Sequence, residues 1–348
     1  MFRYIGNKAK LIPPILERIH ALTGGRGRIA DIMAGTGSVS VALRKAGYQV
    51  FASDIMTYSF HHLVVALLIH DTPTFRGLRG LIEWDEKDPY AAVLRHLNGI
   101  KPEKGFFFEE YSADGVPSNG NPPRKYFSSG NAMKIDSIRR EILHWSLEHA
   151  LTVEEESLLK HTLILAANDV ANISGTYGYF LATYAKNALA PLVLKKVPIV
   201  FDNPNGHSVK QGFAEDLSRE LNADLCYIDP PYMKRQYAAN YHILETLAVG
   251  DAPQLEGKSG LRNWWPQHSR LCTKTKGIDS LTSIIRQMDC PRFLISYSED
   301  GLFSLDELVA NFSPFGKTTV QTIQHNRFRS NGSPLPQQLT EYLITIER

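Results

Sequence analysis

The sequence has few of the features that mark a secreted, membrane-bound or disulfide-stabilised protein. Its three cysteines, Cys226, Cys272 and Cys290, lie far apart and form no C-x-x-C pair. They therefore predict buried thiols in a reducing compartment and argue against a disulfide framework or a zinc site. The longest apolar run, residues 63–69, is too short to span a bilayer, and no apolar segment follows Met1 as in a secretory signal. We therefore expect a soluble cytoplasmic protein.

An excess of charge of one sign is also missing. The chain carries 38 Lys and Arg against 36 Asp and Glu, a net charge of +2, so any attraction to a polyanion must be local. His61, His62 and Asp71 are joined by no cysteine or suitably spaced third ligand, so no metal site is expected. With 348 residues, 43% of them hydrophobic, the chain can form one large or two moderate domains.

The beginning of the chain has the pattern of a parallel α/β sheet. Residues 28–32 are a short apolar strand candidate, a glycine turn follows at residues 34–37, and a helix is expected over residues 38–46. Residues 48–53 then predict a second strand that ends at Asp54. Strand, glycine turn, helix and strand in this order form the opening unit of a parallel sheet.

The same pattern resumes late in the chain, after a long interruption. Further strands are predicted at residues 224–228, 292–298, 318–323 and 341–346. The last two alternate in polarity and resemble an antiparallel pair added to the sheet edge. Residues 75–192 instead show apolar spacing typical of helices, without strand-turn-helix alternation. We therefore predict a discontinuous α/β domain, residues 1–74 and 193–348, interrupted by a mainly helical insertion.

The glycine turn could approach a ligand. Residues 31–37 read Asp-Ile-Met-Ala-Gly-Thr-Gly, and Gly35 and Gly37 would let the backbone come close to a small molecule at a helix N-terminus. Asp54, 17 residues after Gly37, could accept hydrogen bonds from ribose hydroxyls. Position 40 is Ser40 and not glycine, so a nucleoside-type ligand and an ordinary tight turn both remain open.

A second motif is more specific. Residues 229–232 read Asp-Pro-Pro-Tyr directly after a predicted buried strand. The proline pair restricts the backbone, so the Asp229 side chain and the Pro230 carbonyl become two fixed acceptors beside the Tyr232 ring. Two acceptors suit an exocyclic NH₂ group, and the ring suits a stacked base. The alternative is a strand-terminating turn, with Asp229 capping a helix.

Four motifs occur in an order that resembles the D12-class (Dam-like, α-group) adenine-N6 DNA methyltransferases. They are Arg-Tyr-Ile-Gly-Asn-Lys at residues 3–8, the glycine turn at 31–37, Asp54, and Asp-Pro-Pro-Tyr at 229–232. Further stretches are similar to the branch with the FokI-type modification methylases, at residues 172–178, 235–242 and 296–298. The resemblance covers nearly the whole chain, from residue 3 to about residue 343.

The resemblance implies a Rossmann-like methyltransferase sheet with a C-terminal antiparallel hairpin, and S-adenosylmethionine as methyl donor. The cofactor-contacting residues would be Tyr4, Gly6, Lys8, Asp31, Gly35, Gly37, Asp54, Phe213 and Asp229. The residues around the reacting amine would be Asp229, Pro230, Pro231 and Tyr232. Many relatives carry an acidic residue near Phe213, so Phe213 is interpreted either as a contact of the cofactor adenine or as part of the core.

The implied substrate is an adenine flipped out of double-stranded DNA, with the insertion at residues 75–192 as target-recognition domain. Candidate DNA contacts are Arg124, Lys125, Arg235, Asn240, Arg262, Lys274 and Lys276. Trp264 and Trp265 lie among the basic residues of the stretch 258–276. Basic residues with aromatic neighbours suit phosphate contact; the alternative is an ordinary solvated loop with a buried Trp. We expect a monomer that modifies DNA beside a separately encoded restriction endonuclease. An RNA base methyltransferase and a catalytically dead nucleic-acid-binding relative are the alternatives.

Overall fold

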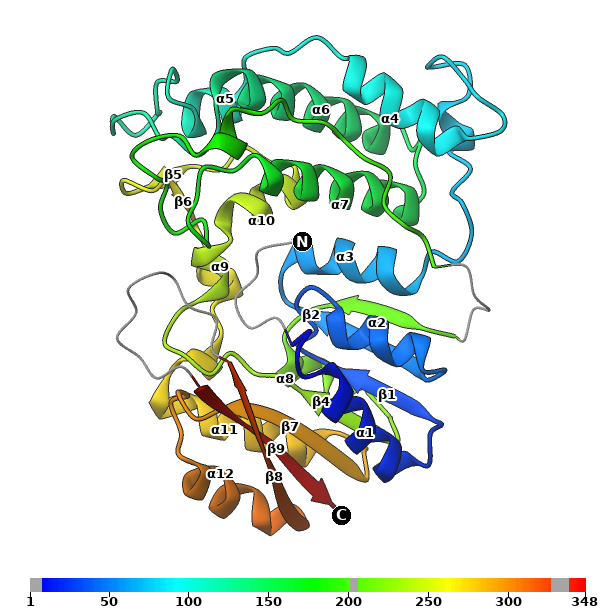
Figure 1. The fold of residues 1–348 in the computed structure, drawn as a ribbon, viewed down its shortest axis with the longest axis vertical. Helices are drawn as coiled ribbons and strands as arrows, with labels where there is room; N and C mark the ends of the chain where they lie inside the picture. Colours follow the sequence, from blue (N-terminus) through cyan, green and yellow to red (C-terminus); the bar gives the residue numbers. More distant parts are fainter. Residues whose placement is uncertain (1–7, 201–205, 327–337) are drawn as a thin grey trace. The chain divides into compact units, whose positions relative to one another are not determined.

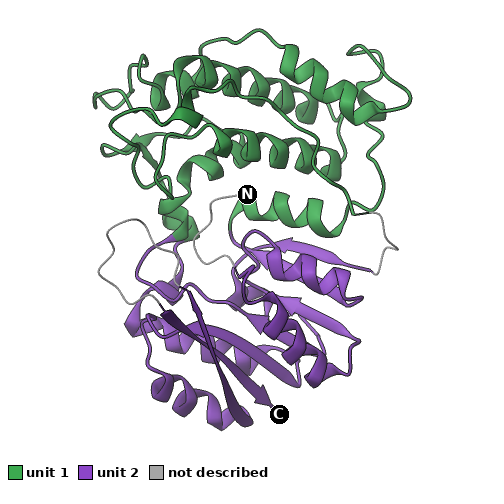
Figure 2. Ribbon diagram, in the orientation of Figure 1, with its two compact units in different colours: residues 1–6, 56–203, 237–267 green, residues 7–55, 204–236, 268–348 purple. Residues whose placement is uncertain are grey.

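A computed structural model describes residues 8–200, 206–326 and 338–348 of the chain (Figure 1). These residues divide into two compact units, coloured separately in Figure 2. The sheet unit comprises the described residues of 7–55, 204–236 and 268–348, and the helical unit those of 56–203 and 237–267.

The sheet unit is built on a seven-stranded sheet with the order β3-β2-β1-β4-β7-β9-β8 (Figure 1). Its strands are β1 (Arg28–Asp31), β2 (Gln49–Asp54), β3 (Ser208–Gln211), β4 (Leu225–Ile228), β7 (Arg292–Ser298), β8 (Lys317–Asn326) and β9 (Gln338–Glu347). Neighbouring strands in the series β3, β2, β1, β4 and β7 pair in parallel, whereas β9 is antiparallel to both β7 and β8. This confirms the predicted α/β class and the antiparallel pair at the sheet edge.

The helices of the sheet unit follow from local sequence. They are α1 (Ile12–Thr23), α2 (Ser38–Lys45), α8 (Ala214–Leu217), α11 (Lys274–Gln287) and α12 (Leu305–Phe312). Prolines occupy the first turn of α1, where no N–H partner is lost, and Gly24 ends that helix in the left-handed conformation. Ser304 and Glu307 form a capping box that begins α12.

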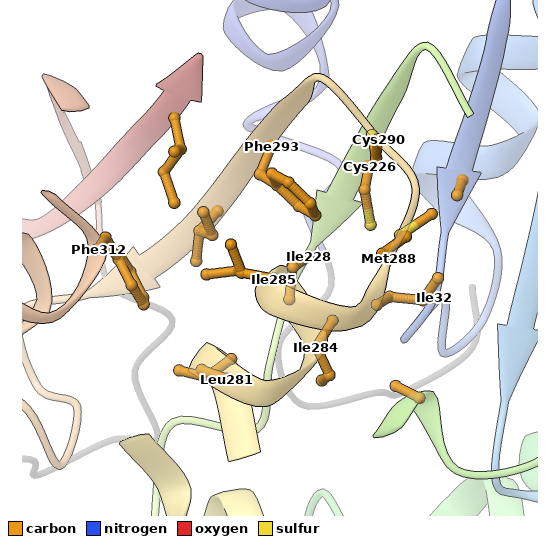
Figure 3. Packing of buried hydrophobic residues seen from close by; sticks show 14 of the residues in the cluster. Ile32, Cys226, Ile228, Leu281, Ile284, Ile285, Met288, Cys290, Phe293 and Phe312 are labelled. Carbon is orange, nitrogen blue, oxygen red and sulfur yellow. The ribbon is translucent and has the colours of Figure 1, made fainter. Parts of the chain in front are cut away.

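One side of the sheet is covered by the apolar face of α11. Figure 3 shows Leu281, Ile284 and Ile285 of this helix packed against Ile228 and Phe293 of the sheet. Burying each such side chain contributes about 1.5–3 kcal/mol. The thiols predicted to be buried, Cys226, Cys272 and Cys290, are indeed buried and free, and burial raises the pKa of each thiol.

The helical unit confirms the helical character of the insertion. Its helices are α3 (Thr57–Leu67), α4 (Pro89–Gly99), α5 (Phe106–Tyr111), α6 (Ser129–Leu147), α7 (Val153–Asp169), α9 (Tyr237–Asn240) and α10 (His242–Val249). A small hairpin, β5 (Leu255–Glu256) and β6 (Leu261–Arg262), follows α10. A capping box of Thr152 and Glu155 begins α7.

The boundaries of the helical unit differ from the 75–192 predicted for the insertion. It also contains α3, which is buried on most of its surface, and residues 237–267. The Glu245 carboxylate of α10 accepts the Thr57 N–H at 2.9 Å, and His61 of α3 hydrogen-bonds Ser157 of α7 at 2.9 Å. His61 and His62 thus pack between helices. A role of this unit in target recognition stays a prediction.

The described residues contain neither a membrane-spanning helix nor a metal-binding cluster. No helix in these ranges combines the length and the apolar character needed to cross a bilayer. In the same ranges, no three His, Cys, Asp or Glu side chains are grouped so that they could hold a metal ion.

Candidate active site

The glycine turn forms at the carboxyl end of β1, as predicted. Gly35 (φ 55°) and Gly37 (φ 78°) both adopt the left-handed conformation that favours glycine, and Gly37 caps the N-terminus of α2. The Ala34 N–H donates to the Ser53 carbonyl at 3.0 Å, which ties the turn to β2. The backbone of the turn is thereby fixed at the carboxyl end of the parallel strands.

The structure brings the turn and the predicted ribose-binding carboxylate together. Asp54 is the last residue of β2, and its Oδ2 accepts the Gly35 N–H at 2.9 Å. The reason is register, because β1 and β2 are parallel neighbours with Asp31 opposite Ala52. Strands that run in parallel end at the same edge, which is where ligands bind in open α/β sheets.

Asp31 occupies a site where a ligand cation could be bound. Its side chain is buried, and Oδ2 accepts a hydrogen bond from the Ser40 hydroxyl at 2.6 Å. Within the described ranges, Oδ1 is buried without a hydrogen-bond partner. Burial raises the pKa of Asp31 to about 7, although the hydrogen bond from Ser40 by itself lowers this pKa. A buried acceptor left over in this way suits a ligand ammonium group.

The Asp-Pro-Pro-Tyr segment begins directly after β4, the other neighbour of β1. Asp31 lies opposite Tyr227, so Asp229 follows at the same edge of the sheet. The Asp229 Oδ1 lies 3.0 Å from the Lys8 ammonium nitrogen. Burial raises the pKa of Asp229 to about 6, an effect that Lys8 opposes and Glu341 reinforces. Asp229 is therefore a more basic acceptor than an exposed aspartate.

Tyr232 is positioned by contacts of its ring and its backbone. The Lys8 ammonium lies 5.3 Å from the ring centroid, in a cation–π contact. The ring meets Tyr297 edge to face at 6.1 Å, and the Tyr232 carbonyl accepts the Leu302 N–H at 2.9 Å. The aromatic side chain is thereby held next to Asp229.

Glu341 is a site residue that the sequence analysis did not identify. Its buried carboxylate lies 2.7 Å from the Lys8 ammonium and accepts the Ser296 hydroxyl at 2.6 Å. Burial would lower the pKa of Lys8, but the charges of Asp229 and Glu341 outweigh it and raise that pKa. One signal was available, because Glu341 shares the strand face of Leu343 and Thr345, where a charged residue is unusual.

The remaining predicted cofactor contacts have different outcomes. Phe213 precedes α8 and is half-buried, and the Gly212 N–H before it donates to the Asp54 carbonyl at 3.0 Å. It therefore lies beside the predicted ribose site, and both interpretations of Phe213 stay open. Tyr4 and Gly6 lie outside the described residues.

The candidate DNA contacts are divided between the two units. In the sheet unit, Arg235 is exposed, and Lys274 and Lys276 are exposed in the first turn of α11, where Lys274 pairs with Glu307 at 3.5 Å. In the helical unit, Lys125 donates to the Ala182 carbonyl at 3.1 Å.

Arg124 differs from the other candidates, because its side chain is completely buried. It forms an ion pair with Glu110 at 2.7 Å and donates to backbone carbonyls at the β5–β6 turn, including that of Lys258 at 3.1 Å. This is a structural role, and we do not retain Arg124 as a DNA contact. Arg262 pairs with Asp251 at 3.0 Å.

The remaining candidate, Asn240, and the two tryptophans of the basic stretch belong to the helical unit. Asn240 is half-buried, and its carbonyl accepts the Tyr177 N–H at 2.9 Å. Trp264 and Trp265 stack at 5.0 Å between ring centroids, and 67% of Trp265 is exposed. The exposed ring makes this segment unlike a loop that buries its tryptophans.

Comparison with known proteins identifies the family. Residues 4–310 match the D12 class N6 adenine-specific DNA methyltransferases. The chain belongs to this family. The adenine in DNA is therefore the methylated base, and the match supports neither the RNA alternative nor the catalytically dead one.

Curated relatives match along the whole chain. This methyltransferase is 30% identical over 353 residues to Type II methyltransferase M.NlaIII of Neisseria lactamica, and the match covers 99% of both chains. It is 31% identical to Type II methyltransferase M.FokI of Planomicrobium okeanokoites and 30% identical to Modification methylase StsI of Streptococcus sanguinis. The chain spans about half the length of those two relatives, 52% of each.

Proposed function

We propose that this enzyme transfers the methyl group of S-adenosylmethionine to the N6 amine of an adenine flipped out of a specific double-stranded DNA sequence. It acts as the monomeric modification enzyme of a restriction-modification system whose endonuclease is a separate chain, in the cytoplasm where such DNA lies. The observation that carries the proposal is Asp229 itself. Its carboxylate stands at the sheet edge, next to the glycine turn, with Oδ1 bound by Lys8.

The residues at the ends of β1 and β2 fit the methyl donor. Oδ1 of Asp31, which has no hydrogen-bond partner among the described residues, suits the amino group of a methionine moiety, and the left-handed turn at Gly35 and Gly37 lets the backbone approach it. Asp54 would hold the ribose, and Phe213 stands beside it for the adenine ring. When bound, the donor supplies an electrophilic methyl group on a sulfonium centre.

Asp229, Pro230 and Tyr232 would bind and orient the target base. The N6 lone pair of adenine is delocalised into the ring, so the amine is a poor nucleophile. Hydrogen bonds from its two hydrogens to the Asp229 carboxylate and the Pro230 carbonyl would favour a more tetrahedral nitrogen. Fixed acceptors and proximity then supply most of the acceleration. A base inside a duplex cannot reach this edge, so it is flipped out and stacked on Tyr232.

The exposed cations would bind the DNA backbone. Arg235, Lys274 and Lys276 of the sheet unit are exposed and would contact phosphates, and Lys125, Asn240 and Arg262 belong to the unit proposed to recognise the target. Arg262 and Lys125 are already bound within that unit, so base reading requires other side chains of the unit as well.

The proposal is tested by sequencing DNA with modified-base detection from cells that express the protein. We expect N6-methyladenine at one recurrent short motif, and none with Asp229→Ala. Binding of S-adenosylmethionine to purified Asp229→Ala should remain measurable by calorimetry. Asp306→Ala replaces an exposed aspartate of α12; it serves as the matched control and should leave methylation intact. Near-normal methylation by Asp229→Ala would contradict the role proposed for Asp229. DNA left wholly unmodified by the wild-type protein would contradict the proposed reaction.

A further inference from the structure

Lys8 lies between two carboxylates from different parts of the sheet: Asp229 follows the end of β4, and Glu341 lies within β9. Its ammonium nitrogen is 3.0 Å from Oδ1 of Asp229 and 2.7 Å from Oε1 of Glu341. The exposed fractions of the three side chains are 6% for Lys8, 18% for Asp229 and 2% for Glu341. One positive charge is thus shared by two negative charges in a place with little solvent.

Glu341 is itself held in place by the sheet. In the antiparallel pairing of β7 with β9, Glu341 lies opposite Ser298, and Ser296 is on the same strand face two residues away. The Ser296 hydroxyl donates to Oε1 of Glu341 at 2.6 Å. Because Oε1 accepts from both Ser296 and Lys8, Glu341 provides a fixed anchor for the lysine.

This sharing changes what Lys8 does to Asp229. A lysine paired with Asp229 alone would draw electron density from that carboxylate with its full charge. With Glu341 present, part of the attraction is taken up by the second carboxylate, and Oδ1 of Asp229 stays more basic. The other ionisable groups that act on Asp229 are Asp31, Tyr227 and Tyr232. All three are acids, so among the described groups Lys8 is the cation that acts on it.

We propose that Glu341 is a positioning residue for methyl transfer, which holds Lys8 on Oδ1 of Asp229 and moderates its charge. Asp229 then remains a strong acceptor for the N6 amine, and its second oxygen is left facing the base. The inference rests on the proposed function of Asp229. Ser296 supports it by orienting the Glu341 carboxylate.

The test is Glu341→Gln, which keeps the size of the side chain and an oxygen acceptor but removes the charge. We expect kcat at neutral pH to fall about tenfold, with little change in the Kd for S-adenosylmethionine. The acid limb of the kcat profile should move to lower pH by about one unit, because Lys8 then pairs with Asp229 alone. A loss of packing would lower kcat without moving the limb.

A second readout does not depend on turnover. Carboxyl ¹³C NMR of aspartate-labelled protein follows the titration of Asp229, whose signal is identified by its loss in Asp229→Asn. We expect the titration midpoint of Asp229 to fall in Glu341→Gln and to stay unchanged in Glu347→Gln. Glu347 is on the same strand, about 20 Å from Glu341 at strand spacing.

Ser296→Ala keeps both charges and removes only the hydrogen bond, so it provides a milder variant should Glu341→Gln not fold. A smaller shift of the acid limb in the same direction is expected. An Asp229 titration that neither variant alters would overturn the role of Glu341. Wild-type protein that methylates no DNA would instead overturn the proposed function, since the titration is measured without substrate.

Discussion

The Ser40 hydroxyl donates a 2.6 Å hydrogen bond to the buried carboxylate of Asp31, across the first turn of α2. In a dinucleotide-binding turn, a glycine at the position of Ser40 would let the helix pack closely on the strand. Here the side chain at that position donates to one oxygen of Asp31, and the other oxygen has no hydrogen-bond partner among the described residues. The serine in place of glycine is therefore bonded directly to a residue of the candidate site.

The first prediction concerns the effect of Asp31 on stability. Burial raises the pKa of Asp31 from its ordinary value of 3.8 to about 7, so the folded state holds this proton more tightly than the unfolded state. The resulting stability is fully present below about pH 4 and is lost as pH rises to about 7. We expect Asp31→Asn to increase the free energy of unfolding by roughly 2–4 kcal/mol at pH 8, but far less at pH 4.5.

Urea unfolding at the two pH values, without the methyl donor, measures the difference. Asp306→Asn, an exposed aspartate of α12, is the control and should show no such pH dependence. An equal effect of Asp31→Asn at both pH values would mean that Asp31 is ionised throughout this range in the folded protein.

The second prediction concerns Asp54. Asp54→Ala removes the acceptor of the Gly35 N–H and the proposed partner of the ribose. We expect the Kd for S-adenosylmethionine to rise about 10- to 100-fold, since one or two charge-assisted hydrogen bonds are lost. Saturating donor should restore most of kcat, because Asp54 does not face the target amine. Calorimetry and steady-state kinetics, with the exposed Asp279→Ala as control, separate the two effects. A drop in kcat with unchanged Kd would contradict this role.

The third prediction concerns phosphate contacts of α11. Lys274 and Lys276 are both exposed in the first turn of this helix. We expect the double variant Lys274→Gln/Lys276→Gln to weaken binding to any duplex. The slope of log K against log salt should decrease in magnitude by about 2, since each phosphate contact contributes about 0.9. Fluorescence anisotropy over a salt series checks this. Lys317→Gln, on the edge strand β8, should leave the slope as it is; an identical slope in the double variant would exclude both lysines from the interface.

The fourth prediction concerns Arg124, which the structure places in the interior. Arg124→Met would leave the buried Glu110 carboxylate without its ion-pair partner. We expect the free energy of unfolding to fall by about 3–5 kcal/mol. Adding Glu110→Leu should recover part of this loss, because no unpaired charge then remains. The neighbouring Lys125→Met should change stability little, since its ammonium is at the surface. A stable Arg124→Met variant with weakened DNA binding would return Arg124 to the set of DNA contacts.

Local sequence patterns were sufficient for the parts of the site that lie directly after strands. Asp54 ends a strand, and the glycine turn and Asp229 each follow one; apolar runs and glycines mark these strands in the sequence. Because parallel strands end at one edge, their order along the chain also predicts that these residues meet. The helices of the insertion were also predictable from local sequence, because their apolar residues recur at helical spacing.

Features that depend on pairing between distant segments could not be obtained in this way. Glu341 meets Lys8, 333 residues away in the sequence, because the register of β9 on β7 places its carboxylate beside the carboxyl end of β7. Arg124 looked like a surface cation, and its burial depends on Glu110 and on the β5–β6 turn more than 130 residues away. The helical unit likewise includes α3 and α10 because both helices pack against α7. Periodicity and motif order encode each strand end, whereas register and burial select which charges become partners.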